Sequence, residues 1–203
     1  MAQLEHPDNL ARFDDPAHRL ITIILMRCGL RVTDALRLPA DCLVADADGA
    51  PYLRYFNHKM KRDALVPIDE HLHELIAEHR QRTAERWPAG TPGLFPRPTK
   101  NVDGSHPIAS FTYRAALLRW LAVCDIRDEH GQPVHLTPHQ WRHTLGHRLN
   151  VRGIASDASF GSPGQRCGSV DLALRHTRRW RSDYHLTRRL SCVDSRHLTA
   201  RMH

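Results

Sequence analysis

The stretch that decides the interpretation of this chain is Leu136–Thr144, with the sequence LTPHQWRHT. Thr137 is typical of the position just before a helix, and Pro138 suits the first helical position because its missing N–H would have no intrahelical partner there. His139 and Arg142 then lie one turn apart on one face of the helix. Both side chains can reach a single anionic group, so the stretch predicts an anion site at the start of a helix.

A second stretch with similar chemistry is Cys28–Leu36, with the sequence CGLRVTDAL. Its Arg31 follows closely on Gly29 and precedes an acidic residue, Asp34. A guanidinium suits phosphate because its planar fork donates two parallel charge-assisted hydrogen bonds and keeps its proton. Taken alone, this pattern also fits a surface arginine at the end of a helix, so Arg142 is the more specific of the two arginines.

The positive charge of the chain is concentrated at one end. A formal net charge of +7 suggests a nucleic-acid partner. However, residues 1–150 hold 19 Lys and Arg against 18 Asp and Glu, whereas residues 151–203 hold ten Arg, four Asp and neither Lys nor Glu. Net charge alone therefore does not support DNA binding by the first 150 residues.

The composition also excludes several classes of protein. No apolar run is long enough to span a membrane, and the front of the chain does not resemble a signal peptide. The five cysteines show no metal-ligand spacing and suit a reducing compartment. We expect a cytoplasmic protein with no membrane partner, associated with the nucleoid if it binds DNA.

The periodicity of apolar residues predicts a mainly α chain with a small antiparallel hairpin, an α+β class. A hairpin is expected because two alternating runs flank a polar turn that contains Lys59 and Lys61. The predicted elements, in order, are a helix over 16–38 broken at Gly29, strands around 52–56 and 64–68, a helix from Asp69, a loop over 88–107, a helix with Phe111, Leu117, Leu118 and Leu121 on its apolar face, and a helix over 137–150.

Together, the two arginine stretches resemble the catalytic domain of tyrosine recombinases, the phage-integrase family of site-specific DNA strand exchangers. The resemblance implies that Arg31 and Arg142 bind the non-bridging phosphate oxygens and that His139 handles the proton of the nucleophile. Lys59 is similar to the family's mobile hairpin lysine, which protonates the departing 5′-hydroxyl, and Lys61 is the competing candidate. No metal and no small-molecule cofactor are implied.

The same resemblance implies double-stranded DNA as the substrate and other recombinase protomers as partners. A different interpretation of the last helix uses its histidines, because His139, His143 and His147 follow at intervals of four on one face. This spacing could bind zinc, but no Glu-bearing zinc motif accompanies it, so we expect no metal. The DNA-binding residues implied are Arg31, Lys59, Lys61, Arg142 and His143.

The resemblance ends after about residue 154. Family spacing places a histidine or tryptophan near Gln165 and the nucleophilic tyrosine near Leu174, and neither residue type is present there. Tyr184 lies about ten positions late by that motif spacing, so we do not expect it to be the nucleophile. A shift of one base within the codons of Asp171–His176 permits His-Tyr-Ala near position 174, which predicts a frame-shifted tail.

We therefore expect three parts: a leader over 1–15 with the family's upstream DNA-clamping domain absent, a truncated integrase-like catalytic domain over 16–154, and an aberrant, poorly ordered basic tail over 155–203. Two functions stay open. In the first, the chain cleaves and rejoins DNA through a 3′-phosphotyrosine intermediate, with Tyr184 or a partner's tyrosine acting in trans. In the second, it is a non-catalytic remnant that at most binds DNA. An incomplete, catalytically impaired integrase is the hypothesis that we favour.

Overall fold

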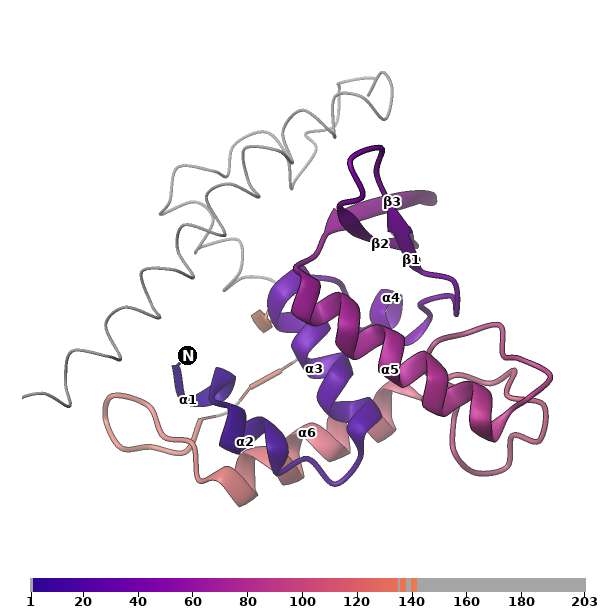
Figure 1. Ribbon diagram of the computed structural model, residues 1–203. Helices are drawn as coiled ribbons and strands as arrows, with labels where there is room; N and C mark the ends of the chain where they lie inside the picture. Colours follow the sequence, from indigo (N-terminus) through magenta and orange to yellow (C-terminus); the bar gives the residue numbers. More distant parts are fainter. Residues whose placement is uncertain (1, 135, 138–139, 142–203) are drawn as a thin grey trace, which may run out of the picture. The chain divides into compact units, whose positions relative to one another are not determined.

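The described part of the chain is built around helix α3 (Pro16–Cys28), which is buried on nearly all sides (Figure 1). The computed structural model describes residues 2–134, 136–137 and 140–141, all of which belong to one unit, residues 1–145. The Asp15 carboxylate accepts a hydrogen bond from the Ala17 amide at 2.8 Å, which caps the helix where Pro16 begins it. Ile21, Ile24 and Leu25 are completely buried, so α3 is a central helix and not a surface helix with one apolar stripe.

Two short helices precede α3: α1 (Ala2–Glu5) and α2 (Pro7–Ala11). Within the residues expected to form a leader, Leu4 and Phe13 join the hydrophobic core. The Phe13 ring stacks on Trp120 at 4.6 Å between centroids, and Trp120 Nε1 donates a hydrogen bond to the Asn9 carbonyl at 2.6 Å. These contacts attach the front of the chain to helix α6 (Ser110–Cys124).

The predicted break at Gly29 is confirmed. Gly29 adopts the left-handed conformation, with φ of 61°, and its amide donates to the Leu25 carbonyl at 3.1 Å, which closes the end of α3. The chain then turns into helix α4 (Val32–Leu36), for which Arg31 is the residue before the first turn. Glycine is favoured here because other residues adopt this conformation at a cost.

The sheet has three antiparallel strands in the order β1-β2-β3: β1 (Leu43–Ala45), β2 (Pro51–Asn57) and β3 (Arg62–Pro67). The predicted hairpin is confirmed, with Asn57 paired to Arg62 next to a turn formed by residues 58–61. Strand β1 was not predicted. It has only three residues and pairs with β2 at Leu43 and Leu53, so its stability depends on a partner and not on a local pattern.

Helix α5 (Glu70–Arg86) begins as predicted after Asp69, whose carboxylate accepts from the Leu72 amide at 2.7 Å. Residues 88–107 form the predicted irregular connection to α6. The prediction for the apolar face of α6 is correct for two of its four residues and wrong for the other two. Leu117 and Leu121 are buried, but Phe111 and Leu118 are 77% and 50% exposed. Tyr113 and Trp120 occupy the core face of α6 instead, because their larger surfaces gain more from burial.

The architecture is therefore α+β, as predicted: helices and one small antiparallel sheet. Of the helix predicted over 137–150, residues 140–141 are helical and the remainder lies outside the described residues. The tail predicted over 155–203 also lies outside them. None of the described helices is long and apolar enough to cross a membrane.

Candidate functional site

Arg31 lies where α4 begins, at the junction between this helix and the β2–β3 hairpin. Its Nη1 donates a hydrogen bond to Asn57 Oδ1 at 3.3 Å and lies 3.7 Å from Asp34 Oδ2. Both contacts use one nitrogen, so Nη2 and Nε have no hydrogen-bond partner among the described residues. The Arg31 side chain is 28% exposed. Within the described part of the chain, the edge formed by Nη2 and Nε is therefore unoccupied, and such an edge has the geometry that binds two oxygens of one group.

Asp34 occupies the first turn of α4 with its carboxylate 1% exposed. Its Oδ1 lies 2.8 Å from His58 Nδ1, and His58 Nε2 lies 3.4 Å from Arg37 Nη1. A carboxylate oxygen accepts, so His58 Nδ1 is the donor in the contact with Asp34. His58 thus bridges the first turn of α4 to Arg37, which follows its last residue.

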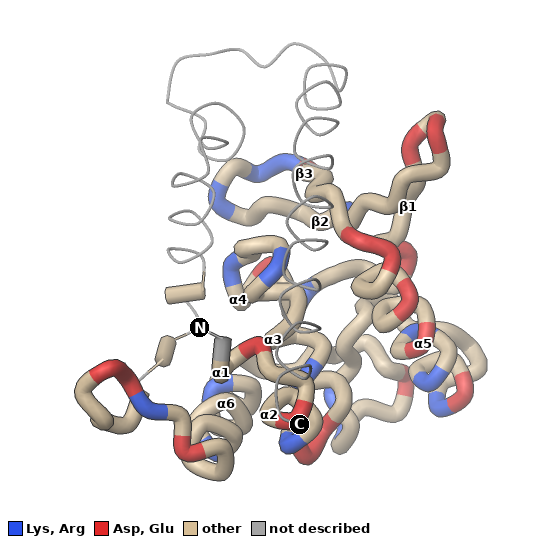
Figure 2. The backbone as a smooth tube through the Cα atoms, turned by 60° about the vertical axis from the view of Figure 1, so that its left-hand side comes forward, with Lys and Arg blue, Asp and Glu red and all other residues tan. Residues whose placement is uncertain are grey.

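The turn of the hairpin carries Lys59 and Lys61, and both side chains are exposed. The Met60 amide donates to the carbonyl of Asn57 at 3.1 Å and to its side-chain Oδ1 at 3.2 Å, so Lys59 lies inside a tight turn. Lys61 has a left-handed backbone, with φ of 50°. Figure 2 shows the basic residues of this turn above those that flank α4.

The structure thus brings three of the predicted residues to one junction: Arg31, Lys59 and Lys61. Arg31 contacts Asn57, which stands two residues before Lys59. His139, Arg142, His143 and Tyr184 lie outside the described residues. Asn57 and His58 were not predicted from the sequence as part of the site. The only local signal was their place beside Lys59, because both partners of these residues lie more than 20 positions away.

The start of the LTPHQWRHT stretch has the expected form. The Thr137 amide donates to Gln140 Oε1 at 2.6 Å, and the Gln140 amide donates to the Thr137 carbonyl at 3.0 Å. A glutamine side chain that reaches back to the residue before a helix is typical of a helix N-terminus. Trp141, directly before Arg142, is 1% exposed and belongs to the hydrophobic core.

Two of the described tyrosines are unsuited to attack a phosphate. The Tyr113 hydroxyl lies 2.9 Å from Thr22 Oγ1 inside the core, and burial raises the pKa of Tyr113 above its ordinary value. Tyr52 is 4% exposed on β2. A nucleophile must reach the phosphorus in line, which these buried side chains do not permit.

Cysteine chemistry and metal binding have little support in the described part of the chain. Burial raises the pKa of both Cys28 and Cys42 to about 12, so these thiols stay protonated near neutral pH. Among the described residues, no group of three or more His, Cys, Asp or Glu side chains could hold a metal ion. His139, His143 and His147, the three histidines that could bind zinc by their spacing, all lie outside the described residues.

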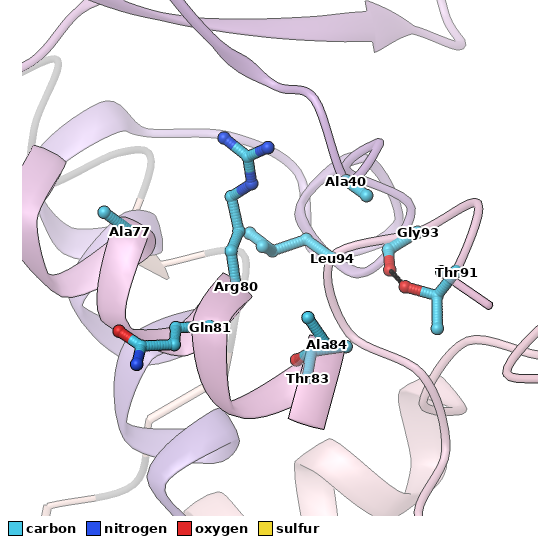
Figure 3. A pocket seen from close by; sticks show the side chains of 10 residues that line it. Ala40, Ala77, Arg80, Gln81, Thr83, Ala84, Thr91, Gly93 and Leu94 are labelled. Carbon is cyan, nitrogen blue, oxygen red and sulfur yellow. Dashed lines mark hydrogen bonds between the residues drawn. The ribbon is translucent and has the colours of Figure 1, made fainter. Parts of the chain in front are cut away.

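A pocket of about 420 Å³ lies between α5 and the loop that contains Thr91 and Leu94 (Figure 3). Small side chains line most of it, Arg80 contributes a guanidinium, and Thr91 Oγ1 donates to the Gly93 carbonyl at 2.8 Å across its rim. Of the predicted site residues that the structure describes, none lines this pocket. The candidate site is instead the exposed junction of α4 and the hairpin.

The sequence model of the phage integrase family matches residues 4–158. The chain belongs to this family. The resemblance to tyrosine recombinases is thereby confirmed.

Among its relatives, this phage-integrase chain is 33% identical over 134 residues to transposase B of transposon Tn554 from Staphylococcus aureus (strain Mu50 / ATCC 700699). It is 32% identical over 134 residues to transposase B of transposon PsiTn554 from Staphylococcus aureus. Each alignment covers 66% of this chain and 20% of the relative. The chain therefore spans about a fifth of the length of the curated relatives it matches.

Proposed function

We propose that this chain binds duplex DNA at the junction of α4 and the β2–β3 hairpin, as the phosphate-binding part of a site-specific recombinase. The observation that carries the proposal is the hydrogen bond from Arg31 Nη1 to Asn57 Oδ1, at 3.3 Å. This hydrogen bond joins Arg31 to the turn that carries Lys59, which follows Arg31 by 28 positions in the sequence. One scissile phosphate needs both groups, and the hydrogen bond to Asn57 brings the turn that carries Lys59 to Arg31.

In the proposed site, the open edge of Arg31 binds two non-bridging phosphate oxygens, and Arg142 binds the same phosphate from the helix that starts near Thr137. Lys59 donates a proton to the 5′-oxygen as the phosphorus–oxygen bond breaks. His139 takes the proton from an attacking tyrosine, whose oxygen forms the 3′-phosphotyrosine bond. Lys61 and His143 add contacts to the DNA backbone. Additional protomers would complete strand exchange.

We also propose that cleavage by this chain is impaired. Tyr52 and Tyr113 are buried and Tyr55 is half-buried on β2, so Tyr184 is the first candidate for attack in cis. Tyr184 lies among Arg, Ser, Asp and His and lacks an apolar helical pattern to fix its position. A chain that binds DNA without cleaving it is therefore the second candidate function. Support for a boundary near residue 154 comes from the family match, which ends at residue 158, and the nucleotide sequence of the locus would test the frame shift.

DNA binding is tested by fluorescence anisotropy of a labelled duplex with the full chain. We expect affinity to fall steeply with salt, because phosphate contacts release counterions. Arg31→Ala should weaken binding to all sequences by about tenfold, as loss of a charge-assisted phosphate contact predicts. Arg82→Ala, on the exposed side of α5, is the matched control and should leave the affinity within about twofold. Equal effects of the two variants would refute the proposed site.

Cleavage is tested separately, by incubating the chain with a nicked suicide substrate and searching for a covalent complex. We expect none, because the sequence around Tyr184 lacks the apolar pattern that would anchor a nucleophile in line with the phosphorus. A complex that Tyr184→Phe abolishes would show that the chain is an active recombinase. A complex that survives Tyr184→Phe would point to Tyr55, which is half-buried on β2.

A further inference from the structure

We propose that Asn57 and His58 are positioning residues that hold the lysine-bearing turn against the start of α4. The inference rests on the proposed function, because it gives these two residues a task at the DNA phosphate. Neither residue needs to touch the DNA. Each connects the hairpin to a charged residue of the α4 segment, and together they set where the turn of Lys59 lies relative to Arg31.

Asn57 makes this connection with a single atom. Its Oδ1 accepts from Arg31 Nη1 at 3.3 Å and from the Met60 amide at 3.2 Å. The Met60 amide also donates to the Asn57 carbonyl at 3.1 Å. Lys59 stands between these two residues, so its backbone is fixed from both sides. Loss of Oδ1 would detach Arg31 from the turn while leaving one hydrogen bond of the turn in place.

His58 makes the second connection with both ring nitrogens, one to Asp34 at 2.8 Å and one to Arg37 at 3.4 Å. These partners lie in the first turn of α4 and directly after its end. The Asp34 carboxylate is 1% exposed, so water does not readily replace a lost imidazole partner. The His58 ring also packs edge-on against Phe56, with centroids 5.1 Å apart.

Apolar packing is incomplete at this end of the hairpin. Phe56 and Met60 are 44% and 50% exposed, so much of their surface stays in solvent. Apolar contacts are also non-directional, so the hydrogen bonds of Asn57 and His58 are the contacts suited to orient the turn. Orientation matters because a proton donor acts only from a narrow range of positions around the leaving oxygen.

The proposed connection and phosphate binding use different atoms of Arg31. Asn57 and Asp34 contact Nη1, while Nη2 and Nε face neither of them. Removing Asn57 Oδ1 therefore changes no charge and removes no phosphate ligand. A weaker DNA complex in an uncharged variant such as Asn57→Ala would have to come from the position of Lys59 and Arg31.

The test uses the full chain and a double-mutant cycle on duplex binding, measured by fluorescence anisotropy. We expect Asn57→Ala to weaken binding by about fivefold in the wild-type background, since one hydrogen bond is worth about 1 kcal/mol, and by clearly less in a Lys59→Ala background, where only the position of Arg31 is still affected. His58→Phe keeps an aromatic ring and should behave in the same way. His58→Asn restores a donor near Nδ1 and should recover part of the affinity. His71→Phe, on the exposed side of α5, is the matched control.

A second measurement reports on the turn without DNA. Amide hydrogen exchange at Met60 should be about fivefold faster in Asn57→Ala, because one of its two acceptors is lost. Thermal unfolding checks that each variant folds.

The inference is overturned if exchange at Met60 is unchanged, or if the effects of Asn57→Ala and Lys59→Ala on binding simply add. That outcome would leave the proposed function intact as long as Arg31→Ala still weakens binding. Absence of duplex binding by the wild-type chain would instead overturn the proposed function and this inference together.

Discussion

The core around α3 and the junction between α4 and the hairpin are held by different kinds of interaction. In the core, Ile21, Ile24 and Leu25 are completely buried among other apolar side chains. At the junction, a buried carboxylate, Asp34, and a half-exposed guanidinium, Arg31, depend on a few hydrogen bonds of defined direction. Apolar contacts are many and non-directional, whereas each hydrogen bond depends on the distance and angle between one donor and one acceptor.

This difference predicts two kinds of mutational response. Changes in the core should reduce stability in proportion to the apolar volume removed and leave the proposed DNA site of the folded molecules unchanged. Changes at the junction should cost less stability and alter the site itself, because each residue there orients a charged neighbour.

The largest effect is expected for Ile24→Ala. Ile24 is completely buried in α3, and truncation there leaves a cavity, so the free energy of unfolding should fall by about 2–5 kcal/mol. Urea denaturation measures the loss. Leu118→Ala on α6, where the side chain is 50% exposed, is the matched control and should change stability by less than about 0.5 kcal/mol. Similar losses in both variants would mean that the outer face of α6 is covered in solution.

The next effect is expected at the junction, for Asp34→Ala. The change removes the acceptor of His58 and the ion-pair partner of Arg31, so we expect a loss of about 2 kcal/mol in stability. Asp41→Ala is the control, because Asp41 pairs with Arg54 on the surface, where such pairs contribute about 0–1 kcal/mol. Chemical denaturation compares the two variants. An Asp34→Ala loss no greater than that of Asp41→Ala would mean that the junction is not a buried polar cluster.

The sequence predicts the core well because apolar burial leaves a periodic pattern. The break at Gly29, the hairpin and the start of α5 after Asp69 all follow from residues close to one another in the chain. Periodicity fails where an element depends on a distant partner. Strand β1 has three residues, and on α6 the positions of Phe111 and Leu118 fit the helical period but face outwards.

The same limit applies to the candidate site. Arg31 and Lys59 could be proposed from the sequence because their residue types, with the motif around them, match a known family. Asn57 and His58 could not, since their role depends on hydrogen bonds to residues 26 and 24 positions away. An asparagine and a histidine in a polar turn carry no local sign of such partners.

A smaller effect is expected for a polar pair inside the core. This pair tests whether a hydrogen bond contributes differently to stability in the core and at the junction. The Tyr113 hydroxyl bonds Thr22 Oγ1 at 2.9 Å, and Thr22 also donates to the His18 carbonyl at 2.9 Å. Tyr113→Phe removes one hydrogen bond but leaves Thr22 a partner, so we expect a loss of about 1 kcal/mol. Urea denaturation checks this value. A loss as large as that of Ile24→Ala would indicate that directional contacts also govern the core.

The smallest effect concerns pH and a titratable group of the core, His79. Its Nε2 lies 3.1 Å from the Leu94 carbonyl, so the neutral ring donates there, and Nδ1 has no partner among the described residues. Burial, and next the charge of Arg82, lower the pKa of His79 below its ordinary value. The unfolded chain therefore binds this proton more readily than the folded chain does.

Stability from this group should be fully present above about pH 6.5, the ordinary pKa of histidine, and should fall as the pH drops from there towards the lower folded pKa. Unfolding free energies at about pH 7.5 and about pH 5.5 measure the loss.

His79→Gln keeps a donor near Nε2 and cannot take up the proton, so the loss of stability on acidification should shrink. His71→Gln, on the exposed side of the same helix, controls for the removal of one histidine. His18, whose pKa burial also lowers, still contributes in both variants, so part of the acid loss should persist. An unchanged loss in His79→Gln would show that the buried ring of α5 does not couple protonation to folding.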